Sequence, residues 1–344
     1  MKNNYTNEVK KKVARVYTAD IFNKNFKNSK CMFNGCQKKP INSHCFQKAM
    51  LEENLSLDNM AYYWSYRSFT DGIRNNEQTN FMPTHVNTLS TFPGFCKDHD
   101  YNLFSAFEDK KSNKDINLKD YAFLNAYRNL CHYLLETCAM GNEDSWNTPP
   151  KNPVIKEKVP ELQQKMKTSF RPLKPEIKEL EELKVIFEKY IQDNGQINPQ
   201  VKEDFRIFIY PLDCELLFAS LACTKLPESK YHISLGILPA TRNIPTRNIP
   251  NIFYIITHNE DAEIYYQMTK AASYYEKLFM QNIVLKSTCN TVIHPNLFEK
   301  LEKIKLITLD EEQKISSELK MLLEFIDKYE SIDFLRYWGF NFFK

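Results

Sequence analysis

The chain has 344 residues, which is enough for two domains. Its 42% hydrophobic and 13% aromatic residues support sizeable cores and exclude a disordered chain. The net charge of +3 gives no overall basic character, the seven glycines form no phosphate-loop motif, and no apolar run is long enough to cross a bilayer. No signal peptide opens the chain, and nine cysteines, an odd number, favour reduced thiols, so we expect a cytoplasmic protein without a membrane partner.

Residues 1–30 are polar and locally basic, with eight Lys or Arg against two acidic residues, a net charge of +6. A weak apolar pattern within this stretch is typical of a short helix or arm. Two interpretations stay open. The segment contacts nucleic-acid phosphates, or it is simply a solvated N-terminus, which is the commoner fate of charge runs.

Two pairs of metal-binding side chains lie between residues 31 and 100. The first pair is Cys31 and Cys36, which bracket the turn dipeptide Asn-Gly, and the second is Cys96 and His99 at the start of a predicted helix. Each spacing lets two side chains from one short turn hold the same ion. The four donors form a Cys3His set, which predicts a closed, structural zinc site with the topology of a treble clef. The alternative is four unrelated residues among nine Cys and seven His.

Helices are predicted downstream of the first pair. Apolar spacing predicts helices over 45–57, 97–107 and 118–140, and residues 60–67 form a strand or a short helix. His132 and Glu136 share one face of the third helix four residues apart. They could be two metal ligands, but with no third ligand nearby in sequence a surface hydrogen-bonded pair is favoured.

A linker is predicted over 146–160, because four prolines and several charges preclude a regular element there. It divides the chain into units at 1–145 and 161–344. A helix is expected over 175–194, and antiparallel strands follow in short aromatic and β-branched runs. The tandem Thr-Arg-Asn-Ile-Pro at 241–250 predicts a lengthened hairpin loop. Later elements are expected at 260–279 (helix), 283–285 (strand), after Pro295 (helix) and at 310–329 (helix), before an aromatic tail that docks on a core.

The predicted fold class is therefore α+β. An N-terminal treble-clef zinc module with helices precedes a C-terminal α+β domain with a small antiparallel sheet.

At residues 28–110 the chain resembles the zinc-containing HNH nucleases. The resemblance rests on the first Cys pair, the Ser43-His44 dipeptide, and the string Phe-Pro-Gly-Phe-Cys-x2-His-Asp that ends at Asp100. The same pattern is similar to a group of functionally uncharacterised bacterial proteins. No characterised family is recognised for residues 200–344.

The resemblance implies roles for particular residues. His44 stands where the family has its general base, and Asp100 where it has its last metal ligand, which suits Mg²⁺ or Mn²⁺. Asn87 is a loose match for the middle Asn of the family. Ser43 departs from the family, which usually has an acidic residue or His there, and a serine hydroxyl is a poor metal ligand. Without the resemblance, His44 could equally be a helix-cap or core histidine, or a replacement zinc ligand.

Three functions are compatible with these residues. The first, implied by the resemblance, is a metal-dependent nuclease that acts on DNA more than on RNA and that could serve as a bacterial defence effector. The second is a catalytically inactive zinc-stabilised module that binds nucleic acid or protein. The third is a structural subunit that docks a partner protein through its C-terminal domain and aromatic tail. A carboxylate from Asp98 or Glu108 that reaches His44 would favour the first function.

Overall fold

The computed structural model describes residues 25–27, 29–65, 82–108, 117–142, 173–213, 215–225, 229–244, 247–264, 266 and 288–303. Several predicted segments lie outside these residues: most of the basic arm, the linker at 146–160, most of the helix at 260–279, the strand at 283–285, the helix at 310–329 and the aromatic tail. The elements expected for these segments therefore remain predictions.

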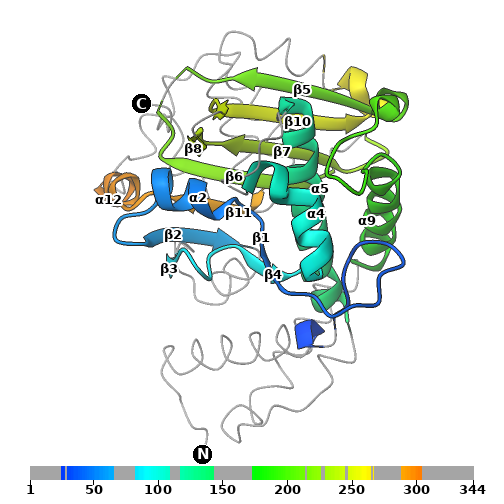
Figure 1. The fold of residues 1–344 in the computed structure, drawn as a ribbon, viewed down its shortest axis with the longest axis horizontal. Coiled ribbons are helices and arrows are strands. Elements are labelled where there is room, and N and C mark those ends of the chain that lie inside the picture. The colour runs from blue at the N-terminus through cyan, green and yellow to red at the C-terminus, as the bar shows by residue number, and fades with distance from the viewer. Residues whose placement is uncertain are drawn as a thin grey trace, which may run out of the picture.

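A seven-stranded antiparallel sheet forms the centre of the described fold (Figure 1). Its order is β3-β2-β11-β6-β7-β10-β5. The strands are β2 (Met60–Ser65), β3 (Met82–His85), β5 (Phe205–Pro211), β6 (Phe218–Thr224), β7 (Ile233–Leu238), β10 (Ile252–His258) and β11 (Thr288–Ile293). Every residue of β7 and β10 is buried, which explains why these two strands read as continuous apolar runs and not as alternating ones.

Two further pairs of strands lie outside this sheet. β1 (Asn42–His44) pairs with β4 (Thr91–Pro93), and β8 (Thr241–Ile244) pairs with β9 (Arg247–Ile249). The second pair contains the tandem sequence and connects β7 to β10, so the prediction of a lengthened hairpin loop is confirmed.

The main helices cover the sheet. They are α4 (Lys97–Glu108), α5 (Leu118–Gly141) and α9 (Leu173–Glu188). Smaller helical segments are α2 (Lys48–Met50), the π-helical η1 (Leu51–Leu55), the 3-10 turns η2 (Pro199–Glu203) and η3 (Asn259–Asp261), and α12 (Pro295–Lys303). Asn117 caps α5 by accepting a hydrogen bond from the backbone N–H of Lys119. Helix α5 crosses the sheet and also packs against α4 and α9, so residues on nearly all its sides are buried (Figure 1).

The hydrophobic core is continuous across the chain. It joins residues of the metal-binding segment, such as Cys31 and Phe95, to Phe187 in α9 and Val292 in β11. The sheet likewise combines β2 and β3, which precede the predicted linker, with five strands that follow it. The small C-terminal sheet expected from the sequence is thus part of a larger sheet. The boundary at 146–160 lies outside the described residues and stays a prediction.

Within the described ranges, no helix combines the length and the apolar character needed to span a membrane.

Candidate metal centre and adjacent polar site

The first two metal-binding residues lie on a short turn before β1. Gly35 has a φ of +75°, a left-handed conformation that glycine adopts without strain, and it brings Cys36 back towards Cys31. The backbone N–H of Cys36 donates to the carbonyl of Phe33 at 3.1 Å, and that of Cys31 donates to the carbonyl of Lys38 at 3.0 Å. These bonds close the turn around the two sulfur atoms.

The second pair is held against this turn by the backbone. The N–H of Met32 donates to the Gly94 carbonyl at 2.8 Å, and the N–H of Ile41 donates to the Phe95 carbonyl at 2.7 Å. Cys96 therefore lies beside the turn, directly before α4 begins at Lys97. His99 follows on the first turn of α4, where a spacing of three residues points both side chains the same way.

The four predicted donors meet at one point. Their donor atoms all lie within 4.8 Å of one another. Cys36 Sγ and Cys96 Sγ are 3.9 Å apart, and His99 Nδ1 lies 3.3 Å from Cys31 Sγ and 3.5 Å from Cys96 Sγ. Tetrahedral zinc with ordinary bond lengths would separate two sulfurs by about 3.8 Å and a sulfur from a nitrogen by about 3.6 Å. The residues therefore fit a metal ion such as zinc.

The electrostatics of the cluster also favour a bound cation. Burial raises the pKa of the Cys31 thiol to about 12, so the thiolate form is unfavourable there without a compensating positive charge. A divalent ion supplies that charge, which couples metal binding to folding. The Phe33 ring packs on the His99 ring with centroids 4.3 Å apart and shields this side of the cluster.

His44 ends β1, which pairs with β4, the strand that precedes Cys96. Its side chain is half-buried, and Nε2 is 3.1 Å from the carbonyl oxygen of Val86. A carbonyl only accepts hydrogen bonds, so Nε2 carries a proton and Nδ1 is the nitrogen left to take one. Burial is the main cause that lowers the pKa of His44. The Val86 carbonyl opposes this shift, and the positive charges of Arg128 and Lys48 reinforce it.

Asp100 lies on the first turn of α4, close enough to His44 for its charge to raise the histidine pKa. Its Oδ1 atom is buried, and no hydrogen-bond partner for it is found in the part of the chain that the structure describes. Asp100 also interacts electrostatically with Arg128 and Glu108. The carboxylate therefore belongs to a small charged cluster behind the metal centre.

Arg128 is the cation of this cluster. It is 1% exposed, and its guanidinium lies 3.5 Å above the centre of the Phe104 ring. Its Nη1 donates to a carboxylate oxygen of Glu108 at 2.5 Å. Burial opposes the charge of Arg128, but Glu108 and Asp100 more than compensate and raise its pKa. Reasoning from the sequence assigned no role to Arg128, although a charged residue on the apolar face of a helix is a signal for a buried ion pair.

The other residues considered from the sequence do not join His44. Ser43 is buried and turned inward, where its Oγ accepts a hydrogen bond from the Phe95 N–H at 3.4 Å. Asp98 is exposed and pairs with Lys38 at 2.6 Å. Asn87 is exposed and follows Val86, with its backbone N–H donating to His85 Nδ1. Glu108 reaches Arg128, as described above.

Among the described residues, Cys31, Cys36, Cys96 and His99 are the one group of three or more His, Cys, Asp or Glu side chains arranged to hold a metal ion. His44 and Asp100 are close enough to interact electrostatically. Among the described residues, no third side chain forms a metal-binding group with these two.

The prediction that His132 and Glu136 form a surface pair is wrong. They do pair, with His132 Nε2 3.5 Å from Glu136 Oε1, but the residues are only 3% and 4% exposed. The reason is that α5 is enclosed by the sheet on one side and by α4 and α9 on others, so it has almost no solvent face. The His132 ring packs edge-on against Phe92 of β4. Burial lowers the pKa of His132 to about 4.

Comparisons of the chain with family models, with curated proteins and with solved structures found no match, so the likeness to HNH nucleases rests on the residues themselves.

Proposed function

We propose that residues 29–108 form a zinc-stabilised treble clef of the HNH type. The order of elements supports this proposal. A turn carries Cys31 and Cys36, the β1–β4 pair follows, and α4 carries His99 on its first turn. The elements between β1 and β4 do not interrupt this arrangement, in which a turn and the start of a helix lie around one ion, as the resemblance implies.

We further propose that the chain cleaves phosphodiester bonds of nucleic acid with His44 as general base and Asp100 as ligand of a catalytic Mg²⁺ or Mn²⁺ ion. The observation that carries the proposal is that a histidine whose pKa is lowered by burial lies within electrostatic range of the Asp100 carboxylate, whose buried Oδ1 has no hydrogen-bond partner in the described part of the chain. A neutral imidazole takes a proton from water as the water attacks phosphorus. A bound divalent ion would stabilise the charge that develops on the phosphate oxygens.

The surface near the metal centre supports a nucleic-acid substrate. Lys30, Lys39 and Lys97 are exposed near the turn and at the start of α4. Lysines at such positions attract the phosphate backbone without reading its sequence. Binding should therefore weaken as the salt concentration rises.

Plasmid nicking in Mg²⁺ or Mn²⁺ tests the proposal. His44→Ala and Asp100→Asn should each lower the cleavage rate by about a hundredfold or more, while zinc content and fold remain unchanged. Asp98→Asn is the matched control, because Asp98 lies on the same helix turn but faces Lys38 at the surface. Equal losses in the Asp98 and Asp100 variants would refute the assigned role of Asp100. Absence of cleavage of DNA and RNA by the unaltered protein with every divalent metal would refute the nuclease proposal.

A second candidate function is a catalytically inactive zinc module that binds nucleic acid or a partner protein. The inward orientation of Ser43 favours it, because the position where the family has a further metal ligand is used here for a backbone hydrogen bond. Salt-sensitive binding of a nucleic acid that stays intact in Mg²⁺ and Mn²⁺ would select this alternative.

A further inference from the structure

A cavity of about 410 Å³ lies away from the metal centre, where α5 and α9 meet the ends of β6 and β7. Tyr133 of α5, Glu176 and Glu179 of α9, Lys225 at the end of β6 and His232 at the start of β7 line it. Its lining thus comes from four separate elements. A volume of this order suits a small molecule.

His232 is the buried group of the cavity. It is 5% exposed and lies between two carboxylates, with Nε2 3.5 Å from Glu176 Oε1 and Nδ1 3.8 Å from Glu179 Oε2. Nδ1 is buried, and it has no hydrogen-bond partner in the described ranges. A buried nitrogen of this kind needs a partner, because an unmade hydrogen bond in the interior costs free energy.

The two carboxylates give the cavity an excess of acceptors. Glu176 accepts a hydrogen bond from the Tyr133 hydroxyl at 2.6 Å, and Glu179 accepts one from Lys225 Nζ at 2.8 Å. Burial opposes the ionisation of Glu176, but His232 and Tyr133 outweigh it and lower the glutamate pKa. Two carboxylates face one lysine, so the cavity is negative unless His232 is protonated.

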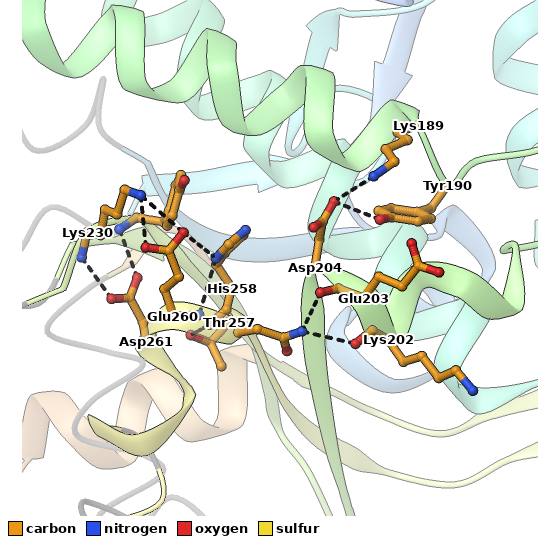
Figure 2. A network of polar contacts seen from close by, with 12 residues as sticks. Lys189, Tyr190, Lys202, Glu203, Asp204, Lys230, Thr257, His258, Glu260 and Asp261 are labelled. Atoms are coloured by element: carbon orange, nitrogen blue, oxygen red, sulfur yellow. Dashed lines mark hydrogen bonds and ion pairs between the residues drawn. The ribbon is translucent and has the colours of Figure 1, made fainter.

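The neighbourhood of His232 is fixed by the polar contacts that Figure 2 shows. Both carboxylate oxygens of Asp261 accept backbone hydrogen bonds, from Lys230 and from Tyr231, each at 2.8 Å. Lys230 Nζ also pairs with Glu260 at 2.8 Å. The chain directly before His232 is therefore held in place, and so is the wall of the cavity that His232 forms.

We propose that this cavity binds a small organic cation that carries several N–H donors, of the alkylammonium or guanidinium type. The oxygens of the two carboxylates are acceptors for such donors. The Tyr133 ring and Pro175 supply an apolar wall for the carbon part of the ligand.

Lys225 contacts the Glu179 carboxylate, which is the group that the proposed ligand would bind. Its side chain is 34% exposed, so it can leave Glu179 for solvent when another cation arrives. The bound cation then donates to the Glu179 oxygen that Lys225 now contacts. Removal of the lysine charge should strengthen the binding of a cation and weaken that of an anion, which separates the two kinds of ligand.

Isothermal titration calorimetry of the full chain with agmatine, which carries both a guanidinium and an amine, tests this proposal. We expect saturable binding that weakens about tenfold or more in Glu176→Gln and in Glu179→Gln. Glu182→Gln is the matched control, because Glu182 lies on α9 but pairs with Lys178 at the surface. Lys225→Gln should bind agmatine more tightly than the unaltered protein.

Two results would overturn the inference. One is the absence of saturable agmatine binding up to millimolar concentrations by the unaltered protein and by Lys225→Gln. The other is binding of inorganic phosphate that disappears in Lys225→Gln, which would identify an anion site. Circular dichroism of each variant checks the fold, and the Lys225 variant decides the matter if a glutamate variant unfolds. The result of the agmatine titration is independent of the proposed nuclease activity, because His44 and Asp100 do not line the cavity.

Discussion

Two of the three cysteines of the candidate metal centre lie inside the hydrophobic core, and Cys36 is half-buried against it. Cys31 and Cys96 are 5% and 3% exposed and belong to the same apolar cluster as Phe95 and Leu103. Thiolates in such surroundings require a cation, and the energy of metal binding then contributes to the stability of the whole cluster.

We predict that zinc is lost and the protein destabilised in the double variant Cys31→Ser, Cys96→Ser. Serine oxygens do not replace thiolates as zinc ligands, and two polar hydroxyls would remain in an apolar environment. Elemental mass spectrometry and thermal unfolding measure the two effects. Cys138→Ser should keep its zinc, because Cys138 is a half-buried thiol outside the cluster. Full zinc occupancy in the double variant would contradict the assignment of the ligands.

His132 makes the stability of the protein sensitive to acid. Burial holds its pKa at about 4 in the folded state, whereas an unfolded histidine titrates near 6.5. The unfolded chain therefore takes up a proton first as the pH falls. The contribution of neutral His132 is present above about pH 6.5 and is lost as the pH falls towards 4, and it is on the order of 3 kcal/mol.

We predict that His132→Gln reduces the fall in unfolding free energy between pH 6.5 and pH 4. Glutamine keeps an N–H donor near Glu136 but has no proton to gain in this range. Urea unfolding across the pH range measures the effect. The variant should be less stable at pH 7, because the contact with Phe92 is lost. An unchanged pH dependence in a folded variant would show that other groups dominate acid unfolding.

The sequence predicted that Cys31, Cys36, Cys96 and His99 come together, but it did not predict the surroundings of the candidate site. The Cys and His pairs are local: four residues separate Cys31 from Cys36, two separate Cys96 from His99, and these short segments decide the geometry. The partners of Arg128 and His44 are non-local, since Glu108 and Val86 approach them only when α4, α5 and the turn after β3 pack together. Burial of His132 depends on that packing as well, and amphipathic spacing along one helix does not reveal it.

Among the elements, helices α4 and α5 and the short helix at Pro295–Lys303 lie close to their predicted bounds. Each has apolar residues at helical spacing, a signal contained within the segment itself. Helix α9 ends at Glu188, six residues before the predicted end, and a turn follows. The addition of β2 and β3 to the C-terminal strands could not be predicted, because pairing of distant strands depends on register and on the core, not on a local pattern.

Two turns use glycine in the same conformation but in different surroundings. Gly35 in the metal-binding turn has a φ of +75°, and Gly195 in the turn after α9 has a φ of +74°. A Cβ on Gly35 would meet no atom within 4 Å, whereas a Cβ on Gly195 would lie 2.4 Å from the Leu103 carbonyl oxygen of α4. The second turn is therefore packed against a helix.

We predict that Gly195→Ala destabilises the protein more than Gly35→Ala. The left-handed conformation costs alanine about 1–2 kcal/mol at either position. Only at position 195 must α4 also shift to admit the methyl group. Thermal unfolding of the two variants with saturating zinc gives the comparison. Equal losses of stability would show that the turn after α9 does not press on α4.

The whole molecule is held together across the predicted linker. Glu188 of α9 accepts hydrogen bonds from the Asn34 backbone N–H at 3.2 Å and from the Tyr127 hydroxyl at 2.5 Å. The metal-binding turn, α5 and α9 thus meet at a single carboxylate. On another side, β2 pairs with β11 along four residues. Parts of the chain on both sides of 146–160 therefore share polar contacts, a sheet and a core.

We predict that limited proteolysis cuts the chain within 146–160 and that the two fragments stay together. Cleavage is expected there because the four prolines and several charges preclude a regular element. Separation would expose the apolar faces of α5 and of the sheet to water and would break the β2–β11 ladder, and both changes cost free energy. Gel filtration of the digest should show one species under native conditions and two fragments in denaturant. Separation of the fragments without denaturant would show instead that 1–145 and 161–344 are independent domains, and resistance of 146–160 to protease would place the boundary elsewhere.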